Sequence, residues 1–502
     1  PMKSIVEERF EIFENGNYTI QVTYGNGDTQ EKSIEVSNLV INPIAKIGEQ
    51  KYDKLEEAIQ AANENETIEI LENFKQNVTI TNRKDIILDL KGHTIDFTKG
   101  IIDNYGNLQI ISSTNEGIIN NHNTEKNDFI VNHSNLIVKS CQLTSENSTV
   151  ILNDGTLTIN KGQIISSSEQ EPVILNNGEK IDIISGIVKS EKGQAIYNNK
   201  GNIKIDNSEI LSEGTGEYTI AIVNYGNGTI ELNGGKVISN ISAIYNTTSG
   251  KINIIGTEIE SNSTESVTLG NDGNGTITIT SGVIRANNNT IYNRSDGEII
   301  INDGEIIGTG ESYPTIYNNI DGKVTINNGT IKSIENNTYS ILNKGELNIF
   351  GGIIEGHGSS AIRAELDSTN IIRGGEITSD NKTAIYNEST KELQINNATV
   401  VSNGEGSVIV NKGNGNIIID NSNISSDFGC PINNILNGNI TIRSGNITTK
   451  GNKKTAIWNE SGNILILGGK ISAKANSIYN NNSSAKVTIG EDDNIVSTDV
   501  PE

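Results

Sequence analysis

The side chains best equipped for chemistry lie between residues 355 and 373. His357 stands between two glycines, and Arg363, Glu365 and Asp367 follow it closely. Histidine and carboxylate groups transfer protons and an arginine stabilises developing negative charge, so this set could serve a polysaccharide lyase or a glycoside hydrolase. A hydrolase needs two carboxylates at a fixed separation, and a calcium-assisted lyase needs an acid cluster, which the sequence does not show. We therefore expect no catalytic residue and interpret the group as a ligand-binding patch or as an irregularity in a repeated structure.

A second set of candidate binding residues is aromatic and recurs at one position of a short motif. The motif reads small residue, Ile, variable residue, Asn. Its variable position holds Tyr245, Tyr292, Tyr317, Tyr386 and Trp458. Aromatic faces can stack on sugar rings, and Tyr292 and Tyr317 belong to consecutive repeats, which predicts rings about 5 Å apart at a stacking distance. The stripe is either a binding track or an outer ladder packed beneath the neighbouring turn.

The repeat that carries these aromatics also predicts the fold. The motif occurs seventeen times between Asn104 and Asn480, with a mean period of about 23.5 residues, which is typical of a solenoid. Each period holds three short apolar pieces separated by turn residues, as in Thr276–Ile279 for one of them. Three strands per coil predict an all-β, right-handed, three-sided parallel β-helix, because parallel crossovers are overwhelmingly right-handed.

Within each coil, alternation along the strand places the Ile inside and the variable residue outside. The Asn then returns to the interior at a corner, where stacked amides can bond from coil to coil. Ala364 is the exception to this Asn ladder, and Asn289, between motifs, is expected to be exposed.

The N-terminal region differs from the repeats. Residues 1–42 alternate apolar and polar side chains around Gly25–Asp28, which predicts a β-hairpin or a partial immunoglobulin-like module. Residues 43–66 are interpreted as a linker and a capping helix over 53–63, with Asp53 and Glu56 forming a capping box. Residues 67–502 are then the β-helix, of about 18 coils.

The composition of the chain disfavours some classes of binding partner and cofactor. The net charge of −24 disfavours nucleic acid and anionic membranes, and no apolar run is long enough for membrane insertion. Cys141 and Cys430 lie thirteen motifs apart, too far for a disulfide, so both should be free. No metal-ligand spacing occurs and no cofactor is expected, although the acidic surface could bind calcium weakly.

The repeated pattern, exemplified by Ala195-Ile196-Tyr197-Asn198, together with Leu88-Asp89-Leu90-Lys91-Gly92-His93-Thr94-Ile95, resembles the pectate-lyase-like parallel β-helix superfamily. It is most similar there to adhesin-like surface proteins of AT-rich Gram-positive bacteria. The resemblance implies a secreted, cell-surface segment of a longer polypeptide, acting as a stalk or as a module that binds a glycan or a host protein. An enzyme acting on acidic polysaccharide is the alternative that the same fold allows.

Overall fold

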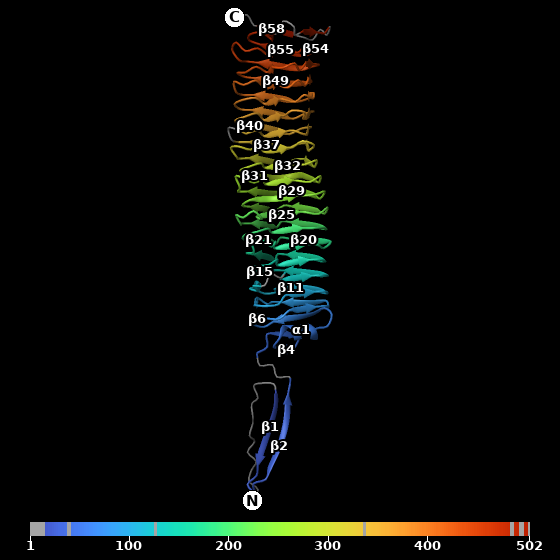
Figure 1. The fold of residues 1–502 in the computed structure, drawn as a ribbon, viewed down its shortest axis with the longest axis vertical. Coiled ribbons are helices and arrows are strands. Elements are labelled where there is room, and N and C mark those ends of the chain that lie inside the picture. The colour runs from blue at the N-terminus through green and yellow to red at the C-terminus, as the bar shows by residue number, and fades with distance from the viewer. Residues whose placement is uncertain are drawn as a thin grey trace.

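The computed structural model describes residues 16–37, 42–124, 128–334, 338–481 and 486–490, and the backbone of 496–499. The chain from residue 45 onward winds into a straight rod of stacked coils (Figure 1). Strands pair in parallel with the equivalent strands of the coils before and after them. The parallel β-helix predicted from the repeat is confirmed.

Three columns of strands make the three faces of the rod. The first face has eighteen strands within the described residues and carries the Ile-x-Asn motif, with Ala364 in place of the Asn on one strand and Leu269 in place of the Ile on another. The second runs from β5 (Glu66–Ile70) and β8 (Ile86–Asp89) to β57 (Val487–Ile489), and the third from β6 (Phe74–Gln76) to β58 (Val496–Asp499). Two long strands, β29 (Lys251–Ser261) and β31 (Thr276–Ala286), run through both the second and the third face.

The strands of the first face are β7 Ile80–Asn82, β10 Ile102–Asn104, β13 Ile130–Asn132, β16 Ile151–Asn153, β19 Ile174–Asn176, β22 Ile196–Asn198, β25 Ile220–Asn224, β28 Ser242–Asn246, β30 Leu269–Asn271, β32 Ile291–Asn293, β35 Ile316–Asn318, β38 Ile341–Asn343, β41 Ile362–Ala364, β44 Ile385–Asn387, β47 Ile409–Asn411, β50 Ile432–Asn434, β53 Ile457–Asn459 and β56 Ile478–Asn480. The first of them, β7, precedes the seventeen motifs recognised in the sequence.

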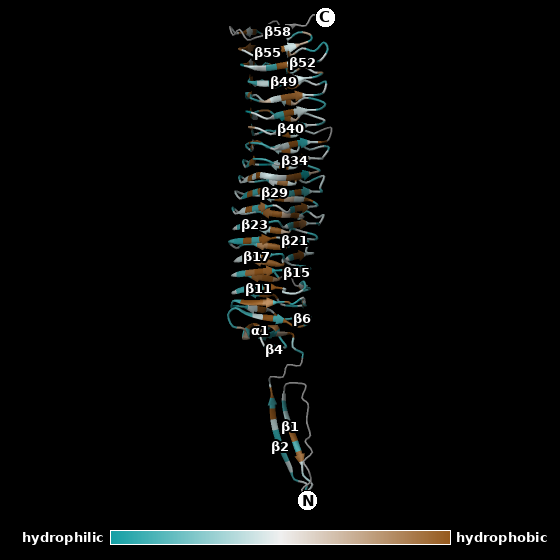
Figure 2. Cartoon of the chain, turned by 180° about the vertical axis from the view of Figure 1, so that it is seen from behind, coloured by the Kyte–Doolittle hydropathy of each residue, from teal (hydrophilic) through white to brown (hydrophobic). Residues whose placement is uncertain are grey.

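The core is a continuous column of aliphatic side chains. Ile196, Ile244 and Ile291 of the first face are fully buried, as alternation predicts, and Ile230 and Ile284 close the core from the other two faces. Figure 2 shows the same division, with hydrophobic colour on the strands and hydrophilic colour on the connecting turns. Each buried aliphatic side chain stabilises the rod by about 1.5–3 kcal/mol.

The asparagines of the first face form a hydrogen-bonded ladder inside the rod. From Asn82 to Asn343, each side-chain Nδ2 donates to Oδ1 of the Asn in the next coil, at 2.7 to 3.0 Å. A second run joins Asn387 to Asn480 in the same direction. The same Nδ2 groups donate to carbonyls of the turn that follows, as Asn318 does to Gly322. Buried amides are thereby satisfied in both directions, which avoids the penalty of an unpaired polar group.

The N-terminal end of the core is covered by α1 (Leu55–Ala61), which buries Leu55, Ala58 and Ile59 and packs against β7. The predicted capping box is wrong. The N-cap residue is Lys54, and no side chain bonds the free N–H groups of the first turn. Glu56 instead accepts a bond from Gln76 of β6 at 3.2 Å, so its carboxylate is engaged with the first coil.

Ahead of the rod, β1 (Gly16–Thr23) and β2 (Thr29–Val36) form the predicted antiparallel hairpin. The remainder of the proposed 1–42 module lies largely outside the described residues, so its immunoglobulin-like interpretation stays a prediction. Cys141 and Cys430 are both free, as expected. Among the described residues no helix is both long and apolar enough to span a bilayer.

Removing one ladder amide should destabilise the rod measurably. Asn318→Ala deletes the bonds to Asn293 and Asn343, so each of these buried amides loses one hydrogen-bond partner, and we expect a loss of about 1–3 kcal/mol in the free energy of unfolding. Chemical denaturation followed by circular dichroism measures this loss.

The control for that experiment must be an exposed asparagine of the same region. Asn289 does not qualify, because the structure buries it and its Nδ2 donates to the Pro314 carbonyl at 2.8 Å. Asn328 is exposed in the turn before β37 (Thr330–Ser333), and Asn328→Ala should change stability little. Equal losses for Asn318→Ala and Asn328→Ala would contradict the structural role of the ladder.

Candidate functional site

The aromatic stripe lies on the outside of the first face. We call the side chains directly before and after each ladder Asn the outer face, because both point away from the core. Tyr245, Tyr292, Tyr317, Tyr386 and Trp458 are all half-buried there. The rings are therefore neither fully exposed nor sealed beneath a turn, and what covers them decides what the face can bind.

Cationic side chains cover several of these rings. The Arg294 guanidinium lies 5.0 Å from the centroid of Tyr292, and the Lys344 amine lies 5.2 Å from that of Tyr317. The pKa of Lys344 is raised, first through its hydrogen bond with Tyr317. Arg294 directly follows the ladder Asn that Tyr292 precedes, whereas Lys344 follows the ladder Asn of the next coil and reaches back to Tyr317.

Tyr292 and Tyr317 are as close as predicted, with centroids 4.7 Å apart, but they do not stack in parallel. Their planes meet at 66°, which is an edge-to-face arrangement. Because the electron-rich faces are taken by Arg294 and Lys344, an edge-to-face contact is the favourable way for the two rings to meet. The predicted flat stacking platform is therefore absent at this pair.

Arg363 replaces the aromatic residue in one coil and is held by its neighbours. Its Nη1 donates to the Tyr339 hydroxyl at 2.7 Å and its Nη2 to Glu388 at 2.8 Å. Its Nε lies 3.3 Å from Glu365 without hydrogen-bond geometry. Burial lowers the pKa of Arg363, but Tyr339, Glu388 and Glu365 raise it more, so the guanidinium stays charged. Such a group positions its neighbours and cannot act as a proton acceptor.

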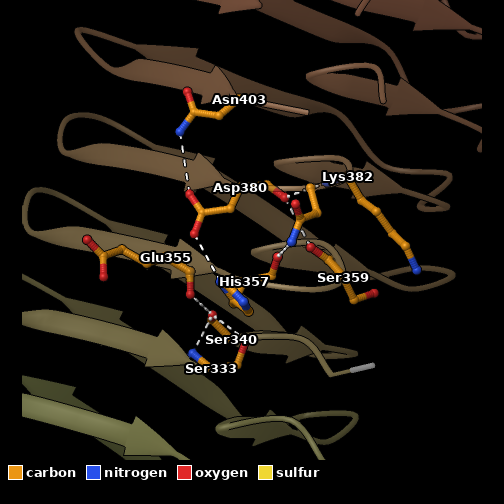
Figure 3. Close-up of polar contacts among 10 residues, drawn as sticks. Ser333, Ser340, Glu355, His357, Ser359, Asp380, Lys382 and Asn403 are labelled. Atoms are coloured by element: carbon orange, nitrogen blue, oxygen red, sulfur yellow. Dashed lines mark hydrogen bonds and ion pairs between the residues drawn. The ribbon is translucent and has the colours of Figure 1, made fainter. Parts of the chain in front are cut away.

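The candidate residues between 355 and 373, which are close in the sequence, lie on different parts of the rod. Arg363 and Glu365 meet on the outer face, whereas His357 follows β40 (Ile353–Gly356) at another corner and pairs with Asp380 at 3.1 Å (Figure 3). Asp367 accepts a bond from the Thr390 hydroxyl.

No serine completes a catalytic pair with His357 among the contacts of the described residues. The Ser340 hydroxyl donates to the Glu355 carbonyl, as Figure 3 shows. Tyr339, Glu388 and Lys412, which surround Arg363 and Tyr386, were missed by the sequence reasoning. Glu388 and Lys412 could have been found from their position in the repeat, because each directly follows the ladder Asn of a later coil.

A groove of about 780 Å³ lies beside this patch and includes Glu365 and Asp367. It exists because the turn at Lys344–Gly345 is short, while the turns of the coils on either side are longer and project Ile320 and Leu366. Those two apolar side chains are 63% and 64% exposed. The groove also holds lysines and further carboxylates, so its charge is mixed and favours no single class of ligand.

Two histidines that looked isolated in the sequence have carboxylate partners. His122 lies 3.5 Å from Asp96 and 2.8 Å from Glu146. His133 bridges Asp103 and Asp154 in the same way, because stacking brings residues one coil apart into contact. No group of three or more His, Cys, Asp or Glu in the described residues has the geometry to hold a metal ion.

The remaining aromatic candidates have different surroundings. Tyr245 lies over Gly270, where a side chain could not fit, since a Cβ there would be 2.6 Å from the ring. Trp458 packs on Tyr479 with centroids 4.3 Å apart and donates from Nε1 to Glu460 at 2.5 Å. Neither ring carries a cation–π contact within the described part of the chain.

The Asn ladder is interrupted at the coil that contains Arg363, and the amide before the gap bonds a different residue. We call this arrangement the detour. Ala364 occupies the ladder position, and Nδ2 of Asn343 donates instead to Asn370 at 2.9 Å. Asn370 is buried at a core position of β42 (Thr369–Ile372), between Leu347 and Leu393 of the coils on either side. Its own amide donates to the Ser368 hydroxyl at 2.9 Å. The irregularity therefore has a structural compensation.

No protein family model matches the chain, and neither a curated protein nor a solved structure matches it.

The detour predicts that Ala364 and Asn370 are energetically coupled. Asn370→Leu alone removes the side-chain acceptor of the Asn343 amide and leaves it only the Gly345 and Thr369 carbonyls. Ala364→Asn alone adds a second amide to a coil in which Asn370 already bonds Asn343. The double variant restores the regular pattern, so we expect a favourable coupling of about 0.5–3 kcal/mol in a double-mutant cycle measured by denaturation. Strict additivity of the two changes would show that the detour carries no stability.

Proposed function

We propose that this rod is a non-enzymatic segment of a bacterial cell-surface adhesin that serves as a stalk and as a module binding a glycan or a host surface protein. The observation that carries the proposal is the outer face of the first column of strands. On several neighbouring coils it carries aromatic, cationic and carboxylate side chains that contact one another, as Arg294 contacts Tyr292 and Asp272 and as Arg363 contacts Glu388. Such an arrangement supports recognition along a surface rather than reaction at a point.

The rod geometry supports the stalk role. Every coil is joined to the next by backbone pairing on its faces, and the amide ladder adds a further bond in nearly every coil. Nearest-neighbour contacts of this kind give a solenoid a fixed length and an extended surface, which is what a spacer requires.

The polysaccharide lyase or hydrolase remains the alternative, and the geometry gives it little support. A lyase base must accept a proton, whereas Arg363 keeps a raised pKa and uses Nη1 and Nη2 within its own patch. His357 is exposed on another corner with Asp380 as its partner and does not share a site with Arg363.

The proposed location is extracellular, at the surface of a Gram-positive cell, with the rest of a longer polypeptide as its anchor. This follows the resemblance of the repeat. The net charge of −24 disfavours sulfated or uronate-rich ligands unless a divalent ion such as calcium bridges them.

Binding through the outer face should depend on its rings. Tyr292→Ala combined with Tyr317→Ala removes two rings and their cation contacts, while the fully buried Ile291 and Ile316 keep the core intact. We expect this double variant to bind glycan arrays or host cells about tenfold or more weakly, at an unchanged melting temperature. Tyr313→Ala is the matched control, because Tyr313 is 44% exposed but lies outside the outer face. Unfolding of the double variant would identify the rings as packing residues and would contradict a binding role.

The enzyme alternative is tested on the same preparation. We expect no unsaturated product and no new reducing ends when the chain is incubated with pectin or other acidic glycans in the presence of calcium. Turnover that disappears in Arg363→Ala or His357→Ala would overturn the non-enzymatic proposal.

A further inference from the structure

A small cleft interrupts the outer face between β22 and β28. It has a volume of about 340 Å³ and is bounded by the rings of Tyr197, Tyr225 and Tyr245. The cleft forms because the outward residue of the intervening coil is Val223, which is too small to fill the space between Tyr197 and Tyr245. Tyr225 packs on Tyr197 with centroids 5.8 Å apart and is itself 53% exposed.

Two carboxylates accompany these rings. Asp272 lines the cleft, and Glu217 reaches it from the exposed loop that precedes β25. The two oxygens of Asp272 differ, since Oδ2 accepts a bond from Arg294 at 3.1 Å whereas Oδ1 is buried without any hydrogen-bond partner. Burial raises the pKa of Asp272, and Arg294 partly offsets this effect.

The rest of the outer face shows what such a combination of ring and carboxylate holds. Arg294 lies over the Tyr292 ring and pairs with Asp272. Arg363 lies 5.7 Å from the centroid of Tyr386 and pairs with Glu388. In each case a cation of the chain is held jointly by an aromatic face and a carboxylate, an arrangement that is strengthened when partly shielded from water.

The cleft combines the rings with two carboxylates, and Arg294, which pairs with Asp272 from outside the lining, bonds Oδ2 alone. No lysine or arginine is among the residues that line it. Its walls also include aliphatic side chains such as Ile220 and Ile241, which would contact the alkyl groups of a substituted ammonium. Half of the lining is polar, with Gln194, Ser242, Thr247 and Ser266 beside the two carboxylates, so the choice of a cation over a sugar rests on the three rings and the two acidic side chains.

We propose that this cleft binds an organic cation, namely a primary or quaternary ammonium group, whether on a free small molecule or on a lysine side chain of a partner. Tyr197, Tyr225 and Tyr245 supply the aromatic walls, and Glu217 and Asp272 supply the negative charge. The inference rests on the proposed function, because it names a ligand class for one part of the same outer face.

The test is titration of the full chain with choline, tetramethylammonium and N-acetyl-lysine methylamide, monitored by calorimetry and by the tyrosine ring resonances. The control ligand is the uncharged dimethylbutanol in which carbon replaces the quaternary nitrogen of choline. We expect saturable binding of at least one cation and none of the neutral analogue. Preference for choline or for the lysine derivative distinguishes a free amine from a protein side chain as the source.

Matched variants locate the binding. Tyr225→Leu should weaken cation binding about tenfold, and Glu217→Gln should weaken it as well, because each removes an exposed group without touching the core. Tyr225→Phe should bind normally, since it keeps the ring, and Tyr313→Leu should have no effect.

Equal binding of the neutral analogue, no binding of any cation, or an unchanged affinity in Tyr225→Leu would overturn the inference. Loss of this cleft's binding with intact attachment to glycans or host cells would leave the adhesin proposal standing. Cation binding without any surface attachment would leave the cleft assignment standing and count against the adhesin.

Discussion

Vertical register is the constraint on which the rest of this protein depends. Each side chain of a coil lies against the side chain at the same position in the coils before and after it. The Asn ladder enforces this register from inside, because an amide that donates to the next coil cannot slip by one residue without facing the opposite side of the strand. Aligned amide bonds also polarise one another, which strengthens the run as a whole.

Register explains why the fold could be predicted and why several details could not. The Ile and Asn positions repeat locally, so the core, the ladder and the free cysteines followed from the sequence. The contacts of His133 or Arg363 depend instead on residues more than twenty positions away, and turn lengths vary enough to obscure which ones. Asn289 looked like a turn residue, yet its amide satisfies the Pro314 carbonyl of the next coil.

The helix that covers the N-terminal end of the core was predicted correctly, but the capping box at its start was wrong for a related reason. Asp53 and Glu56 have the spacing of a capping box, but tertiary contacts with the first coil engage Glu56 through Gln76. Alternation along the strand predicted that the aromatic side chains point outward, but not the contacts of Arg294 with Tyr292 and of Lys344 with Tyr317, which involve residues that directly follow ladder asparagines. Where an arginine of the chain contacts both a ring and a carboxylate of the outer face, these groups are occupied. A ligand can reach them only where no lysine or arginine lines the surface, as in the cleft bounded by Tyr197, Tyr225 and Tyr245.

The interrupted ladder has a consequence for how the gene could change. Unequal recombination between repeats removes or adds whole coils, and a loss of one complete coil keeps Ile over Ile and Asn over Asn along the first face. The coil at Ile362–Ala364 is the one whose excision would even improve the seam, since Asn343 would then meet Asn387 directly. Because each coil contacts only its neighbours, the number of coils sets the length of the rod in steps of one coil.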